Sequence, residues 1–383
     1  MNLLSKRNIK NINNNYDVLI IGAGPVGCVI AERFSKIFNY KCLIIEKRNH
    51  IAGNCFDTTN KKKLLYHKYG PHYLRFKNKK TFDYLSNFTK WNDANYIVKS
   101  YVNRNLLPFP INLNTLEKFF NIKFKDLKSA KRFMKNKKIK YKKINNSEKY
   151  ILSNLGKEIY EKFYKNYTIK QWGKHPSKIS HKIAGRIPIR YNRNNEYVNE
   201  KLKKMPKQGY TKMFEAMLNN KNIDVLLNTD FFQIKNKIKY PKYTIYTGLP
   251  DRYFNYRYGK LKWRSLKFKF NTYKKNLLQS CVQYNYPNNF KFTRKVEIKH
   301  VTKQRSPFTV ISKEYPNSIG EPYYPINDKE NIKLYGKYKN LISKLAKRNI
   351  FFEGRLATYR YLNTDEVIEQ ALKLFNKIKK KIK

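Results

Sequence analysis

The sequence predicts an α/β fold in which a parallel-sheet domain is interrupted by a helical insert and by an antiparallel sheet. Two stretches near the N-terminus carry this prediction. Val18–Ile21 has the composition of a buried parallel strand and leads directly into a glycine-rich turn. A second strand-like run, Lys41–Ile45, follows after the length of one helix. Similar short runs at 225–227 and 244–248 are expected to be strands that return to the first sheet, and the run at 350–352 lies in a C-terminal segment expected to belong to the same domain.

The glycine turn predicts a dinucleotide-binding site of the Rossmann type. Its spacing is G-x-G-x-x-G, in which Gly22 permits a tight turn, Gly24 lets a pyrophosphate approach the backbone, and Gly27 allows close helix packing. The helix that begins near Pro25 would offer its unpaired N–H groups to the phosphates.

An acidic residue identifies the class of dinucleotide. Glu46 ends the second strand, nineteen residues beyond Gly27, where a carboxylate is expected to bind a ribose hydroxyl. A carboxylate would also repel a 2′-phosphate, so NAD or FAD is expected rather than NADP. The alternative is a signal peptide, because Lys6, Arg7 and Lys10 precede the apolar run. The glycines and proline that break this run disfavour that reading.

The remaining chain divides into alternating segments. Residues 114–185 are expected to be helical, with Asn114 as the first cap and a basic solvated face at 122–143. Aromatic-rich alternating runs at 260–312 are typical of an antiparallel sheet. The predicted boundaries are a disordered leader at 1–15; a discontinuous dinucleotide-binding α/β domain at 16–76, 205–255 and 340–383; a helical substrate or lid domain at 114–185; and an antiparallel sheet domain at 77–113, 186–204 and 256–339.

The composition is extremely basic. The chain has 383 residues, with 83 Lys and Arg against 26 Asp and Glu, which gives a net charge of +57. A field of this size attracts polyanions. However, the basic residues are spread along the chain together with many Asn, Ile, Tyr and Phe, so we interpret the charge as compositional drift rather than specific nucleic-acid binding.

Other compositional features point to a cytoplasmic protein. No apolar run is long enough to cross a bilayer, so membrane insertion is not expected. The six histidines lack metal-ligand spacing, and no metal is expected. The four cysteines lack CxxC spacing and are interpreted as reduced core thiols: Cys28, Cys42, Cys55 and Cys281.

Four uncommon motifs occur in one order along the chain. They are Pro108–Leu113 (PFPINL), Tyr167–Gly173 (YTIKQWG), Glu321–Ile326 (EPYYPI) and Gly354–Leu362 (GRLATYRYL). With them, residues 16 to 375 closely resemble the UDP-galactopyranose mutase family of flavoenzymes, in its compact bacterial form. The resemblance implies a Rossmann-like FAD-binding domain and isomerisation of UDP-galactopyranose to UDP-galactofuranose. It also implies that N5 of reduced FAD is the nucleophile at the anomeric carbon.

The resemblance also implies roles for particular residues. Arg186, on a mobile lid, and Arg294 would stabilise the diphosphate, and His72 would lie in a loop near N5 of the flavin. The implied substrate-binding residues are Phe163, Tyr164, Tyr167, Thr168, Trp172, Tyr197, Asn285, Tyr324 and Tyr361. The implied cofactor-binding residues are Gly22, Gly24, Pro25, Gly27, Glu46, Lys47, Gly53, Asn54, Arg355, Tyr361 and Leu362. An external electron donor for FAD and a homodimer are the other expected partners.

Two departures from the family pattern affect these assignments. Asn363 stands where the family commonly has an acidic residue, and a family asparagine has no clear match near Tyr96. Three alternatives stay open beside the mutase, on the shared glycine loop and architecture, on the variety of sugars in the family, and on the net charge. They are a mutase for another nucleotide sugar, an FAD-dependent oxidoreductase of the amine-oxidase-like class with net redox chemistry, and a nucleic-acid-binding protein that keeps an inactive flavin fold.

Overall fold

A parallel sheet built from both halves of the chain forms the core of the first domain. The computed structural model describes residues 2–4 and 15–382. Within them, six strands pair in parallel in the order β1 (Asn2–Leu4), β11 (Ile223–Leu226), β3 (Cys42–Ile45), β2 (Val18–Ile21), β12 (Tyr243–Tyr246) and β18 (Ile350–Phe352). The strands are hydrophobic because the sheet is covered on both faces.

Alternate residues of β2 pack into two different cores. Val18 and Ile20 join the cluster that includes α1 (Pro25–Phe38) and α13 (Thr364–Ile382), whereas Leu19 and Ile21 join the cluster beneath α9 (Phe231–Ile234) and α12 (Lys329–Ala346). These helices cover the two faces of the sheet, as expected for a Rossmann-like domain. The predicted fold class is therefore confirmed.

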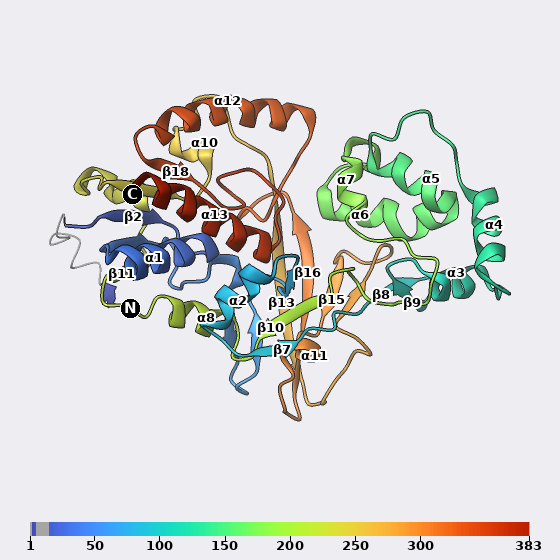
Figure 1. Ribbon diagram of the computed structural model, residues 1–383. Coiled ribbons are helices and arrows are strands. Elements are labelled where there is room, and N and C mark those ends of the chain that lie inside the picture. The colour runs from blue at the N-terminus through green and yellow to red at the C-terminus, as the bar shows by residue number, and fades with distance from the viewer. Residues whose placement is uncertain (1, 5–14, 383) are drawn as a thin grey trace.

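A second sheet, of seven strands, lies beside the parallel-sheet domain (Figure 1). All of its neighbouring strands are antiparallel except the parallel pair β14 and β8. Figure 1 shows its long strands β13 and β16 between the parallel-sheet domain and a helical lobe drawn in green. The order is β17 (Tyr324–Pro325), β13 (Trp263–Tyr273), β16 (Thr309–Asn317), β15 (Arg294–Val296), β14 (Gln283–Asn285), β8 (Val98–Val102) and β9 (Asn105–Phe109).

The helical lobe contains the segment predicted to be helical. Its helices are α3 (Leu113–Phe120), α4 (Leu127–Lys137), α5 (Ser147–Ile159), a π-helical turn at Tyr160–Lys165, α6 (Asn166–Trp172), a short turn at Pro176–Lys178 and α7 (His181–Ala184). The cap of α3 differs from the prediction. Asn112, not Asn114, accepts a hydrogen bond from the Thr115 N–H in a capping box, and Asn114 lies inside the helix.

The other elements connect these layers. A three-stranded sheet has the order β6 (Leu74–Phe76), β10 (Leu202–Pro206) and β7 (Trp91–Asp93), and a hairpin joins β4 (Asp57–Thr59) to β5 (Leu65–His67). The remaining helices are α2 (Lys79–Ser86), α8 (Tyr210–Met217), α10 (Pro250–Tyr253) and α11 (Lys299–Thr302), with short turns at Gly53–Cys55 and Lys235–Lys237. None of the helices in the described ranges has the length and apolarity that a membrane crossing requires.

Two expected boundaries differ from the structure. Asn2–Leu4 were expected to belong to a disordered leader, but they pair with β11 because that strand is otherwise the edge of the parallel sheet. Residues 5–14 of the expected leader lie outside the described residues. The expected boundary between 339 and 340 falls inside α12, a continuous helix that packs against β18.

Alanine substitutions at two glycines should have opposite effects on the stability of the fold. A Cβ on Gly27 would lie 2.0 Å from the Gly22 carbonyl oxygen, whereas one on Gly336, in α12, would meet nothing within 4 Å. Gly27→Ala should therefore lower the free energy of unfolding by about 1 to 3 kcal/mol. Gly336→Ala should raise it by roughly 0.5 to 1 kcal/mol through helix propensity. Urea unfolding of both variants measures this, and equal effects would contradict the close packing at Gly27.

Candidate active site

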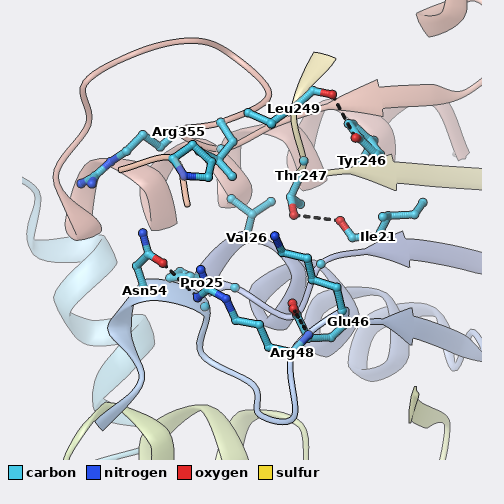
Figure 2. A pocket seen from close by; sticks show the side chains of 18 of the residues that line it. Ile21, Pro25, Val26, Glu46, Arg48, Asn54, Tyr246, Thr247, Leu249 and Arg355 are labelled. Atoms are coloured by element: carbon cyan, nitrogen blue, oxygen red, sulfur yellow. Dashed lines mark hydrogen bonds between the residues drawn. The ribbon is translucent and has the colours of Figure 1, made fainter. Parts of the chain in front are cut away.

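The first cavity lies at the carboxyl ends of the parallel strands. It has an empty volume of about 1280 Å³. Figure 2 shows Asn54 and Arg355 at one end of this cavity, and Tyr246 and Leu249 at the other. The predicted cofactor residues that line it are Gly22, Gly24, Pro25, Glu46, Lys47, Gly53, Asn54 and Arg355. This is the edge of an α/β sheet at which ligands bind in Rossmann-like folds.

The glycine turn leaves the start of α1 open to a ligand. Gly22 has a φ of 108°, and a Cβ there would lie 2.1 Å from Oγ1 of Thr247. Gly53 has a φ of 55°, and its Cβ would lie 3.0 Å from Cα of Gly24. The N-cap Gly24 makes no side-chain capping bond, so α1 presents N–H groups to the cavity. A close backbone and free donors fit a pyrophosphate.

Glu46 holds the turn in addition to facing the cavity. Its buried carboxylate accepts hydrogen bonds from the backbone N–H groups of Ala23 (2.8 Å) and Arg48 (2.9 Å). Each oxygen keeps a further lone pair for a ribose hydroxyl. The sequence predicted the ribose contact of Glu46 but did not predict its hydrogen bonds to the backbone of the turn.

Three residues predicted to bind the cofactor lie outside the lining of the first cavity. Gly27 acts through packing, because a Cβ at this position would lie 2.0 Å from the Gly22 carbonyl oxygen. The Leu362 carbonyl accepts hydrogen bonds from the Arg355 guanidinium, so it orients that arginine, and the Leu362 side chain is buried. Tyr361 lines the second cavity. Gly27 thus has the packing role that the sequence predicts, and direct cofactor contacts of Leu362 and Tyr361 stay predictions.

A second cavity adjoins the first. It has an empty volume of about 1600 Å³, and Asn54, His72, Arg355 and Thr364 line both cavities. All the residues predicted to bind substrate or take part in catalysis line it: His72, Phe163, Tyr164, Tyr167, Thr168, Trp172, Arg186, Tyr197, Asn285, Arg294, Tyr324 and Tyr361. The fold thus brings together residues that are up to 289 positions apart, from His72 to Tyr361.

Three neighbouring strands place polar side chains in one row. Asn285 of β14 is paired with Arg294 of β15, which is paired with Glu314 of β16. Nε of Arg294 donates to the Tyr167 hydroxyl (2.7 Å), and Nη1 donates to Oε2 of Glu314 (3.4 Å). Burial raises the pKa of Glu314, whereas the charge of Arg294 lowers it. The remaining donors of Arg294 are available to an anion in the cavity.

A second arginine approaches the cavity from the helical lobe. Nη2 of Arg186 donates to Oδ1 of Asn363 (2.6 Å), and its guanidinium carbon lies 3.8 Å from the ring centre of Tyr361. The neutral Asn363 thus accepts the hydrogen bond at the position where the family commonly has an acid. Burial raises the pKa of Tyr361, but Arg186, Arg355 and Arg294 outweigh burial and leave this pKa below its ordinary value. The cavity is therefore strongly positive.

His72 stands where the two cavities meet. Its Nδ1 lies 2.9 Å from the Gly70 carbonyl oxygen, and its backbone N–H donates to Nδ1 of His67 (3.0 Å). Burial lowers the pKa of His72 to about 3, and the fields of His67 and Arg355 act in the same direction. The imidazole is accordingly neutral at physiological pH.

Sequence reasoning missed several residues of the second cavity. The ring of Tyr73 stacks on that of Tyr96 with centroids 4.4 Å apart. The Tyr96 hydroxyl donates to Gln283, which donates to Asn285 (2.7 Å), so this chain of contacts orients Asn285. Arg75 also lines the cavity. With 32 tyrosines and 83 Lys and Arg in the chain, no residue type singles these positions out.

The fold and the two cavities define a Rossmann-type dinucleotide-binding protein with an adjoining cavity lined by arginine and aromatic side chains. The sequence model of UDP-galactopyranose mutase matches residues 162–361, and that of an NAD(P)-binding Rossmann-like domain matches residues 20–88. The chain belongs to the UDP-galactopyranose mutase family.

Individual relatives agree with this membership. A probable UDP-galactopyranose mutase of Klebsiella pneumoniae is 36% identical over 366 residues, which cover 94% of each chain. UDP-galactopyranose mutase of Mycoplasma genitalium is 34% identical, covering 97% of this chain and 96% of the relative. A dTDP-fucopyranose mutase of Escherichia coli is 29% identical, covering 93% and 96%. A crystal structure of reduced UDP-galactopyranose mutase has the same fold, with a TM-score of 0.75, 14% identity and coverage of 95% and 93%.

A buried acid beside the second cavity predicts a pH dependence of stability. Burial raises the pKa of Asp365 to about 7, Glu366 acts in the same direction, and Oδ1 has no hydrogen-bond partner among the described residues. An unfolded chain ionises this group near pH 3.8. Between these values the folded state binds the additional proton, so stability falls as pH rises.

Asp365→Asn removes this titration. The Tm of the variant should therefore fall less than the wild-type Tm when pH is raised from about 5 to about 8. Thermal unfolding of both proteins at the two pH values measures the difference. Parallel changes in Tm would show that Asp365 has an ordinary pKa.

Proposed function

We propose that this protein interconverts UDP-galactopyranose and UDP-galactofuranose by ring contraction, as an isomerase that uses reduced FAD. The observation that carries the proposal is the junction of the two cavities at His72, with Arg186 and Arg294 facing the second one. A dinucleotide in the first cavity would have its reactive end beside an anionic ligand in the second. Membership of the mutase family supports this reading.

The aromatic side of the second cavity is proposed to bind the nucleoside. Tyr167 would stack on the uracil, framed by the buried side chains of Phe163 and Tyr164. Thr168 and Trp172 would meet the ribose. Helix α6 carries three of these residues in a single turn and a half, which explains their clustering in the sequence.

The positive side is proposed to bind the diphosphate. Arg186 and Arg294 would make charge-assisted contacts with it and stabilise the negative charge that develops on departing UDP. Tyr197, Tyr324 and Tyr361 would direct their hydroxyl groups toward the same oxygens. Tyr324 and Tyr361 have ring centroids 5.3 Å apart, so the two phenols flank one region of the cavity. Asn285 would contact the sugar.

The first cavity fits the cofactor of this family, FAD. Its pyrophosphate would lie against the backbone of Gly22, Gly24 and Gly53 and the guanidinium of Arg355, because N–H donors and a cation suit phosphate oxygens. Its ribose would be bound by Glu46, because a carboxylate accepts from hydroxyl groups. When bound and reduced, FAD supplies N5 as a nucleophile toward the anomeric carbon. The protein aligns the two ligands and excludes water, while neutral His72 keeps a hydrogen-bonding group at their junction.

Partners and location stay proposals. Isomerisation needs no net electron transfer, yet reduced flavin is required, so we propose an external electron donor. A homodimer and a cytoplasmic location are proposed as well, the latter supported by four buried free thiols among the described residues. The 29% identical dTDP-fucopyranose mutase makes another nucleotide sugar the second candidate substrate.

Product analysis tests the proposed function. Dithionite-reduced protein incubated with UDP-galactofuranose should yield the pyranose form, separated by chromatography, and the oxidised protein should not. Parallel incubations with a dTDP-linked and an N-acetylated sugar would identify a different preference. Absence of turnover on every sugar despite bound FAD would reject the mutase, and flavin reduction by an amine would favour the oxidoreductase.

Arg294→Ala tests the positive side of the cavity. The change removes charge that interacts with the departing diphosphate, so kcat should fall by about 10² to 10³-fold. FAD absorbance should persist because Arg294 does not line the first cavity. Arg305→Ala, an exposed arginine elsewhere, is the control for loss of one charge from this basic chain. Loss of flavin from Arg294→Ala would instead assign Arg294 to the cofactor.

A further inference from the structure

Lys170 lies within the nucleotide-binding helix but does not line the cavity. On α6, Tyr167, Thr168, Gln171 and Trp172 all line the second cavity. The side chain of Lys170 extends instead to the loop that joins β14 to β15. The family resemblance implied no role for this lysine, although it lies in the Tyr167–Gly173 motif.

The ammonium group of Lys170 is surrounded by backbone carbonyls. It donates to the carbonyl oxygens of Tyr286, Phe290 (2.9 Å) and Phe292 (3.3 Å). These three acceptors use all three N–H donors of a lysine. Within the described ranges no carboxylate forms an ion pair with Lys170. The ammonium group of Lys170 therefore binds the backbone of this loop rather than an acidic side chain.

The loop joins two residues of the second cavity. Asn285 ends β14 and Arg294 begins β15, and these two short strands share three residue pairs. The rings of Tyr286, Phe290 and Phe292 pack together with centroids 4.8 to 5.1 Å apart, and the carbonyls of these same residues turn toward Lys170. Asn288 accepts a hydrogen bond from the Asn166 side chain and donates one to the Lys162 carbonyl, both 2.9 Å.

Lys170 therefore connects the two halves of the substrate site. On one side is α6, with the residues proposed to bind the nucleoside. On the other is the hairpin that carries Arg294, which itself reaches back to the Tyr167 hydroxyl. The two strands are themselves held in the sheet by β8 and β16, so the docking of their loop on α6 joins the helical lobe to this sheet and fixes the distance between the nucleoside and diphosphate contacts.

We propose that Lys170 is a positioning residue for nucleotide binding, which holds the Tyr286–Phe292 loop on α6 and thereby sets Arg294 and Asn285 against Tyr167 and Trp172. The proposal rests on the proposed function, since it takes the second cavity as the site of a uridine diphosphate. Lys170 touches neither substrate nor cofactor.

Lys170→Met tests the proposal by removing the ammonium group while keeping the length of the side chain. The Kd for UDP, measured by calorimetry on the oxidised FAD-loaded protein, should rise by about tenfold or more, because three charge-assisted hydrogen bonds are lost. In turnover assays KM should rise more than kcat falls. FAD content should be unchanged, since Lys170 is not among the residues that line the first cavity.

Matched variants make each outcome decisive. Lys162→Met removes an exposed lysine from the same helical segment, so it controls for the lost charge and should leave the Kd for UDP within about twofold. If Lys170→Met fails to fold, Asn288→Ala undoes the same docking from the loop side and should also weaken UDP binding. Wild-type affinity in Lys170→Met or in Asn288→Ala would overturn the proposal. Failure of the wild-type protein to bind UDP would instead overturn the proposed function.

Discussion

The hydrogen bonds of Arg294 to Tyr167 and Glu314 hold a largely buried positive charge in the wall of the second cavity. A guanidinium group is costly to bury unless its donors are satisfied, and here one carboxylate and one phenol satisfy only part of them. The free donors face a cavity to which Arg186 and Arg355 add charge. The site is therefore short of negative charge, which agrees with the diphosphate that we propose to bind there.

The surrounding structure follows from this requirement. Strand pairing places Asn285, Arg294 and Glu314 side by side, so the row depends on backbone register rather than on flexible side chains. The helical lobe adds the aromatic half of the site, and Arg186 reaches across to Asn363 and Tyr361. The parallel sheet contributes the open end of α1. Each layer thus supplies a different chemical property at one place.

Sequence reasoning succeeded where a residue type has one physical reason to be present. The strand, glycine turn and Glu46 could be predicted because few residues other than glycine tolerate the φ of Gly22. The site residues were brought together by the resemblance of whole motifs, since an arginine or tyrosine in this composition carries little information alone.

Prediction from the sequence failed where contacts between distant segments determine the local structure. Asn112 and Asn114 are equally good caps by residue type, and both donate to Asn195 of the neighbouring loop, so only the capping box of Asn112 with Thr115 distinguishes them. The strand Asn2–Leu4 depends on an available sheet edge. The chain from Tyr96 through Gln283 to Asn285 joins segments 187 residues apart, which periodicity within either segment cannot indicate.

The four residues shared by the two cavities limit how this chain can be divided. Asn54 and His72 lie near one end of the sequence and Arg355 and Thr364 near the other, and each lines both cavities. No single cut in the chain therefore leaves either cavity with its complete lining. A fragment that keeps the glycine turn but ends before Arg355 would lack part of the wall of both cavities, so truncation would open the two sites together.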